Sequence, residues 1–122
     1  MLLGLLALCL AAPDTMVCAA GDFQPLIGRW QRTDGGYIIE IRSIAPDGTM
    51  AAGYYNPQPI NVSRAQVFIF KDYTKIEVEL RDQGYPGSFY TLTYSPDKDV
   101  FFGYYYHAVS AQYFDVLFVR MK

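Results

Sequence analysis

Apolar and polar residues alternate along most of this chain, and turn-forming stretches interrupt the alternation about every ten residues. The alternation is clearest in residues 75–81, where Ile76, Val78 and Leu80 share one face and charged residues occupy the other. A period of two residues is typical of a strand with one buried and one wet face. The pattern therefore predicts antiparallel β-structure, and no segment after residue 20 shows a convincing helical period.

The turn signals divide the chain into eight expected strands. They lie around Trp30 and at residues 37–44, 49–55, 61–70, 74–81, 88–94, 100–107 and 112–120. The connections are too short for the long crossovers of most β-sandwiches. Closure also removes exposed sheet edges. We therefore predict an all-β fold, an eight-stranded antiparallel up-and-down barrel whose interior is either filled or holds one small ligand.

The first 20 residues have the pattern of a signal peptide. The apolar run 2–12 is shorter than the roughly 20 residues that cross a bilayer, and small residues follow it at Cys18-Ala19-Ala20. We expect residues 1–20 to be removed and residues 21–122 to form one secreted or periplasmic domain without a membrane span. A lipid anchor on Cys18 is the alternative. Cleavage would also remove Cys9, which leaves no thiol in the domain.

Three short motifs resemble avidin- and lipocalin-type barrels, the calycin group. They are Gly28-Arg29-Trp30, which opens the first strand; Arg120, near the end of the last; and residues 47–54, which resemble the second avidin hairpin. The resemblance implies that Arg120 packs across Trp30 at the closed end of the barrel, and that Tyr54 faces a ligand at the open end. Avidins hold biotin with later tryptophans, and this chain has only Trp30, so the resemblance does not extend to biotin.

The aromatic cluster at residues 101–106 is the strongest local signal for binding. Tyrosines at a barrel mouth suit a small, partly polar ring, because rings stack and hydroxyl groups orient the ligand. We take Tyr54, Asn56, Tyr104 and Tyr106 as candidate ligand-binding residues. The alternation does not decide which face of 100–107 points inward. Two alternatives remain: the aromatics fill the core, or they form an outer patch for a protein partner or for self-association.

Several classes of function lack their characteristic residues. The net charge is −2, so no basic field gathers nucleic acid. His107 is the only histidine, and a catalytic triad would need it beside Ser88 or Ser110 and an acid such as Asp115. A structural zinc site would need three carboxylates in addition to that histidine. We expect no catalytic residue, metal or cofactor.

The sequence thus favours a non-catalytic binding protein for a small molecule at the barrel mouth. The alternative is an inhibitor of a protease or a lysozyme that acts through loops 56–60 or 83–87. A carrier should leave a cavity of some hundred Å³, whereas an inhibitor should have a filled core and a protruding loop. Arg32 shares the face of Trp30 and needs a partner or a ring to stack on. The pattern leaves the oligomeric state open.

Overall fold

The computed structural model describes residues 23–122, and the expected signal peptide at 1–20, with Cys9 and Cys18, lies outside this range. A short 3₁₀ helix, η2 (Gln24–Leu26), precedes the strands. The strands are β2 (Gly28–Arg32), β3 (Ile38–Ile44), β4 (Met50–Tyr55), β5 (Pro59–Ile60), β6 (Val62–Phe70), β7 (Tyr73–Leu80), β8 (Phe89–Ser95), β9 (Val100–His107) and β10 (Gln112–Arg120). No helix within residues 23–122 is long and apolar enough to cross a membrane.

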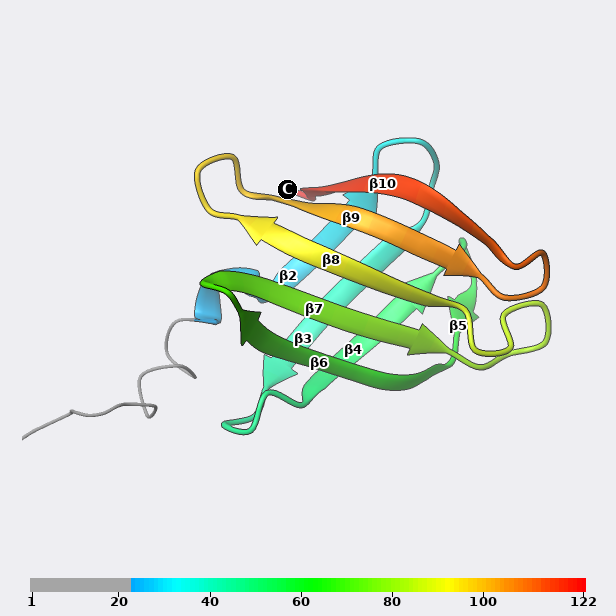
Figure 1. Ribbon diagram of the computed structural model, residues 1–122, viewed down its shortest axis with the longest axis horizontal. Coiled ribbons are helices and arrows are strands. Elements are labelled where there is room, and N and C mark those ends of the chain that lie inside the picture. The colour runs from blue at the N-terminus through cyan, green and yellow to red at the C-terminus, as the bar shows by residue number, and fades with distance from the viewer. Residues whose placement is uncertain (1–22) are drawn as a thin grey trace, which may run out of the picture.

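The strands form one antiparallel sheet that curls into a nearly closed barrel (Figure 1). Their order is β5-β4-β3-β2-β10-β9-β8-β7-β6, so the first long strand pairs with the last. The remaining seam lies between β4 and β6, which meet through an isolated bridge between Thr49 and Gln66. The predicted all-β antiparallel barrel is confirmed.

Residues 23–122 form nine strands where the sequence predicts eight, because the chain folds back after Asn56. Asn56 N donates to the carbonyl of Gln58 in a tight turn. Pro59 and Ile60 then pair with Tyr55 and Tyr54 as the short strand β5. A proline is acceptable there, because β5 is an edge strand and needs no donor on its outer side.

Side chains fill the barrel interior. Trp30 and Phe118 are fully buried, and Phe101 packs edge-on against Trp30 with 4.6 Å between the ring centroids. The aliphatic part of this layer comes from β3, β7 and β8, namely Ile39, Ile41, Ile76, Val78, Leu80 and Leu92. The filled core meets one of the two conditions that we set for an inhibitor, the other being a protruding loop.

Gly103 permits the close approach of β8 and β9 on the inner face. A Cβ atom at this position would lie 2.1 Å from the carbonyl oxygen of Thr91, which is backbone and has little freedom to move. Strands in a small barrel must coil strongly, and a residue without a side chain allows that coiling at the tightest point. The gap that Gly103 makes in the aromatic run is therefore a packing requirement.

Candidate functional site

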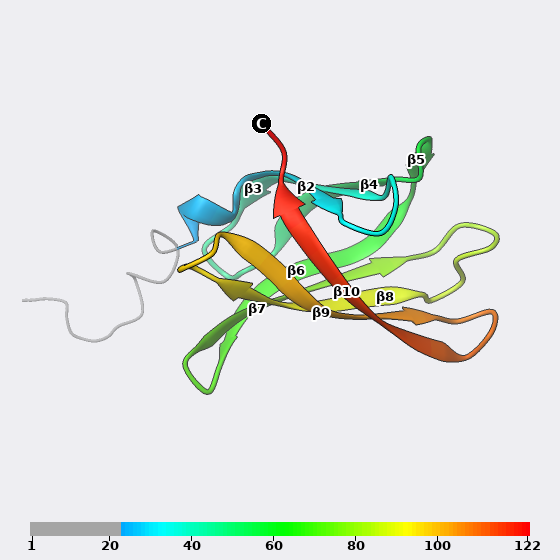
Figure 2. The ribbon, with the colours of Figure 1, turned by 90° about the horizontal axis from the view of Figure 1, so that it is seen from above.

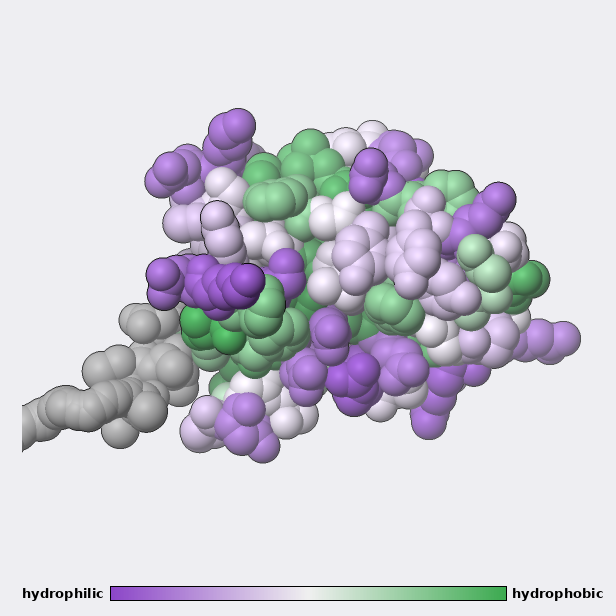
Figure 3. Space-filling model, viewed as in Figure 1, coloured by the Kyte–Doolittle hydropathy of each residue, from purple (hydrophilic) through white to green (hydrophobic). Residues whose placement is uncertain are grey.

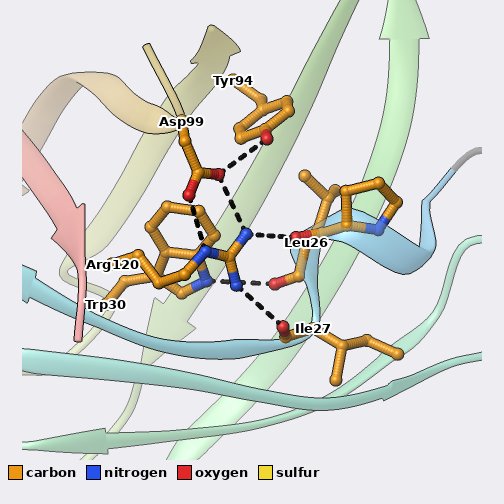
Figure 4. Close-up of polar contacts among 7 residues, drawn as sticks. Leu26, Ile27, Trp30, Tyr94, Asp99 and Arg120 are labelled. Carbon is orange, nitrogen blue, oxygen red and sulfur yellow. Dashed lines mark hydrogen bonds and ion pairs between the residues drawn. The ribbon is translucent and has the colours of Figure 1, made fainter. Parts of the chain in front are cut away.

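The closed end of the barrel is held by the contact between the first and the last strand (Figure 4). The guanidinium carbon of Arg120 lies 4.3 Å from the centre of the Trp30 ring. Arg120 also donates to the carbonyls of Pro25 and Ile27, and to both carboxylate oxygens of Asp99 at 2.7 and 2.9 Å. This is the arrangement expected from the sequence, with Asp99 as an additional partner.

Gly28 makes room for this contact. Its φ of +145° disfavours other residues, and a Cβ atom here would lie 2.9 Å from Nη1 of Arg120. The hydrogen bonds from Arg120 lower the pKa of Asp99 below its ordinary value, since they favour the charged carboxylate. Trp30 donates from Nε1 to the carbonyl of Leu26. Gly28, Trp30 and Arg120 thus join η2 to the barrel at its closed end.

The opposite end, the barrel mouth, holds an open recess of about 260 Å³. Side chains from three strands and three loops line it, most of them aromatic or polar: Arg32, Tyr37, Tyr54, Asn56, Tyr85, Tyr105 and His107. The rims are tied together, because Asn56 Nδ2 donates to the Tyr85 hydroxyl at 2.6 Å. The loops after β4 and β7 therefore form one side of the same recess.

Arg32 lies in the wall of the recess and is only 9% exposed. Its guanidinium carbon is 4.2 Å from the centre of the Tyr37 ring. Nε and Nη2 donate to Asp34 at 2.7 and 2.8 Å, and Nη1 donates to the Tyr90 hydroxyl at 3.1 Å. Burial alone would lower the pKa of Arg32, but the bonds to Asp34 and Tyr90 outweigh it and keep the guanidinium charged.

Two N–H bonds of Arg32 find no acceptor within residues 23–122. A guanidinium carries five N–H donors, and three of those of Arg32 are used by Asp34 and Tyr90. One further hydrogen on each terminal nitrogen remains. Since buried donors are nearly always paired, these two mark a place where an oxygen acceptor would be stabilised.

Tyr54 lines the recess, and its hydroxyl group is hydrogen-bonded to that of the buried Tyr90. Their hydroxyl oxygens are 2.8 Å apart, and both side chains are almost fully buried. Burial raises the pKa of Tyr90 to about 12, and it raises that of Tyr54 as well, so both phenols remain neutral donors at physiological pH. Tyr105 stacks on Tyr90 with 4.5 Å between the ring centroids.

The structure brings together two of the four residues expected to bind a ligand. Tyr54 and Asn56 line the recess, whereas Tyr104 and Tyr106 lie on the outer face of β9. The expectation that they line the mouth is therefore wrong. Pairing with β10 sets Phe101 opposite the buried Phe118, so alternate residues from that point turn inward and the even-numbered tyrosines turn outward.

Tyr105 and His107 take the inward positions on β9, and Tyr37 and Tyr85 complete the recess from loop positions. A four-residue turn at 108–111 sets His107 opposite Gln112. The length of this turn fixes which residues of β9 and β10 lie opposite each other. Since Arg120 points inward, the sequence could have placed Tyr105 on the inner face. No comparable local signal exists for Tyr37 and Tyr85, because the barrel brings their loops together.

The outward-facing rings form a cluster of their own, the outer aromatic cluster, made of Phe89, Tyr104, Tyr106 and Tyr113. Tyr113 lies 4.8 Å from Tyr106 and 5.2 Å from Tyr104 between ring centroids. Figure 3 shows pale and green surface over β8 to β10, with charged purple side chains over β6 and β7. An outward patch is the condition under which we expected a protein partner or self-association.

His107 Nδ1 and Ser110 Oγ lie 2.7 Å apart at the tip of the β9–β10 hairpin. Within residues 23–122 no carboxylate is hydrogen-bonded to His107, and Asp115 shares the outer face of β10 with Tyr113. Ser88 is fully buried and accepts a hydrogen bond from Ala108 N. In the same part of the chain, no group of three or more His, Cys, Asp or Glu side chains is placed to hold a metal ion.

Comparison with protein-family models, with curated proteins and with solved structures finds no match.

Proposed function

We propose that this protein is a secreted or periplasmic, non-catalytic binding protein that takes a small ring-containing acid in the mouth recess. The observation that carries the proposal is Arg32, which lines a recess of about 260 Å³ beside tyrosine rings and has two N–H donors without an acceptor among residues 23–122. The calycin-like resemblance supports a binding site at the same end of the barrel, because such barrels bind ligands opposite their closed end. The pattern of residues 1–20 supports export.

The chemistry of the lining selects the class of ligand. The rings of Tyr37, Tyr85 and Tyr105 offer faces on which a planar group stacks. Arg32 supplies donors for a carboxylate, which a guanidinium binds with two parallel hydrogen bonds. Asn56 adds a carbonyl and an amide at the rim. The volume suits one ring and its substituents, since it falls below the range of roughly 300–1,000 Å³ that drug-sized ligands occupy.

Native mass spectrometry of the purified protein tests for a ligand that it carries from its host. Calorimetry with benzoate and 4-hydroxybenzoate, against benzamide and benzyl alcohol, then tests the role of Arg32. We expect the carboxylates to bind at least tenfold more tightly than their neutral analogues. Equal binding of the acids and the neutral analogues, or no binding of any ring compound, would refute the proposal.

A pair of variants tests the position of the site. Tyr85→Ala removes one recess ring and should weaken benzoate binding about tenfold, the scale of one aromatic contact. Tyr104→Ala removes a ring of similar size from the outer face and should leave binding unchanged. Equal losses in the two variants would place the ligand elsewhere.

A second candidate, protein binding of the inhibitor kind, is favoured by the filled core and by a projecting hairpin. The β6–β7 hairpin extends from the barrel at its closed end (Figure 2). Ile69, Phe70 and Tyr73 at its tip are 53%, 54% and 61% exposed. Lys71 and Asp72 have φ values of +51° and +70°, as in the rigid two-residue turns of hairpins. Loops 56–60 and 83–87, which the sequence suggested for this role, lie instead around the mouth.

Inhibition assays against a panel of lysozymes and secreted proteases test this second candidate. If the hairpin tip inserts into an enzyme, Phe70→Ser combined with Tyr73→Ser should abolish the inhibition, and Arg64→Ala on the side of the same hairpin should not. Inhibition that survives the double substitution would exclude the tip.

A further inference from the structure

The first half of β10 is paired on one side only, so its other side forms a sheet edge. β10 pairs with β9 along Gln112 to Val119, but its pairing with β2 covers only Phe118, Val119 and Arg120. The β9–β10 hairpin consequently projects past β2, as Figures 1 and 2 show. Both faces of the projecting strand are exposed, since Tyr113 is 64% and Phe114 44% exposed.

The backbone groups at this edge can be assigned. Residues of an antiparallel strand alternate between bonding to one neighbour and to the other. The carbonyl of Leu117 accepts from Thr33 N, and Met121 N donates to the carbonyl of Arg29, so the odd-numbered residues of β10 bond away from β9. The N–H and C=O groups of Tyr113 and Asp115 therefore point to the open edge. No hydrogen bond to these four groups exists within residues 23–122.

This edge lacks most of the features by which proteins block strand addition. Such edges commonly carry lysine, proline or a bulge. Residues 112–116 contain none of these, and Asp115 is their single charge. By contrast, the edge of β6 at the seam has a register shift between Val62 and Arg64, and β5 begins with Pro59. Residues 112–116 of β10 thus form an edge without such a block.

We propose that two copies of this chain associate through this edge, with β10 of one copy antiparallel to β10 of the other about a two-fold axis at Phe114. In this register Tyr113 lies opposite Asp115 of the second copy. Because both residues direct their backbone groups outward, the two copies form four backbone hydrogen bonds. Phe114 lies opposite its own copy as a non-hydrogen-bonded pair, which covers its exposed ring.

The residues at the edge favour a second copy as the occupant. An isologous contact requires a self-complementary strand, and this register sets tyrosine opposite aspartate and phenylalanine opposite phenylalanine. A register centred on Asp115 would place two like charges opposite each other, which destabilises a sheet. The dimer also joins the two outer aromatic clusters, because Tyr113 of each copy lies beside the axis.

Sedimentation velocity of the purified protein across roughly 1–200 μM, the range in which modest interfaces associate, measures the state directly. We expect a reversible dimer. Asp115→Pro removes an N–H that has no bond within the subunit and should weaken the dimer at least tenfold. Asp115→Ala keeps that N–H and is the matched control, which should remain dimeric. Near-ultraviolet circular dichroism establishes that both variants are folded.

Cross-linking supplies a positive test that does not depend on the proline variant. Residues opposite each other in a non-hydrogen-bonded pair have Cα atoms about 4.5 Å apart, within disulfide range. In a background with Cys9→Ser and Cys18→Ser, Phe114→Cys should form a disulfide-linked dimer under mild oxidation, and Tyr104→Cys should not. A monomer throughout the concentration range, or a dimer that Phe114→Cys does not trap, would overturn the proposal.

Discussion

Replacing Arg120 with alanine is the most direct test of how this barrel is closed. The substitution removes the cation from the Trp30 ring, the two bonds to Asp99, and the donors to the carbonyls of Pro25 and Ile27. A hydrogen bond to a charged group contributes about 1.5–3 kcal/mol when buried. An exposed ion pair contributes about 0–1 kcal/mol, and a cation–π contact about 0.5–2 kcal/mol.

The burial of these groups decides which value applies. The Arg120 side chain is 30% exposed and that of Asp99 is 44% exposed. The ion pair should therefore contribute about 0–1 kcal/mol, as an exposed pair does. The carbonyl of Ile27 and the Trp30 ring are better shielded. We therefore expect a loss of about 2–4 kcal/mol in the free energy of unfolding. For a domain of this size, the melting temperature would fall by roughly 10–25 °C.

Thermal and urea denaturation measure this loss, and two further variants isolate its cause. Arg120→Lys keeps the charge but has only three donors, all on one nitrogen, for the four oxygen atoms that Arg120 serves, so it should recover less than half of the stability. Arg64→Ala removes an exposed arginine that also lies near two carboxylates, at 3.4 and 3.6 Å, and should cost less than about 1 kcal/mol. If Arg120→Ala has the same melting temperature as the wild type, the closed end is held by something other than this contact.

Three further predictions concern the core, the recess and acid stability. Gly103→Ala places a methyl group against backbone and should cost about 3 kcal/mol or prevent folding, as urea denaturation would show. Tyr90→Phe leaves Arg32 Nη1 and the Tyr54 hydroxyl without their partner and should cost about 1–3 kcal/mol, whereas a wild-type denaturation curve would contradict the network. The bonds from Arg120 lower the pKa of Asp99 below 3.8, so the folded state binds this proton less readily than the unfolded state. The resulting stability is complete above that pH and lost on acidification below it. Asp99→Asn should accordingly flatten the fall in melting temperature between pH 5 and 2. An unchanged slope would argue against a contribution of Asp99 to the acid sensitivity.

The strands and the closed end could be predicted because their signals are local. Alternation and turn residues place the eight long strands within one or two residues of their observed limits. Trp30 and Arg120 stand out because an arginine on an apolar face requires a partner. β5 could not be predicted, because its two residues, one of them a proline, show no alternation and pair only as a consequence of the preceding turn.

The mouth was harder to predict because β9 has aromatic residues on both faces. Phe101 and Tyr105 point inward while Phe102 and Tyr104 point outward, so hydrophobicity alone does not separate the faces. The register with β10 does separate them, since it follows from the length of the turn. The remaining walls of the recess come from loops far apart in the sequence, and only closure of the barrel brings them together.

The pairing of β2 with β10 also bears on when the fold can form. Trp30 lies opposite Arg120, ninety residues later in the chain, so the contact that closes the barrel spans nearly the whole domain. Contacts of such long sequence separation slow folding, because the loop between them must be ordered first. A nascent chain whose residues 112–120 are still inside the ribosome therefore holds an open sheet. The barrel can close only after β10 has emerged, so any cellular factor that holds the nascent chain meets the strands before their core is sealed.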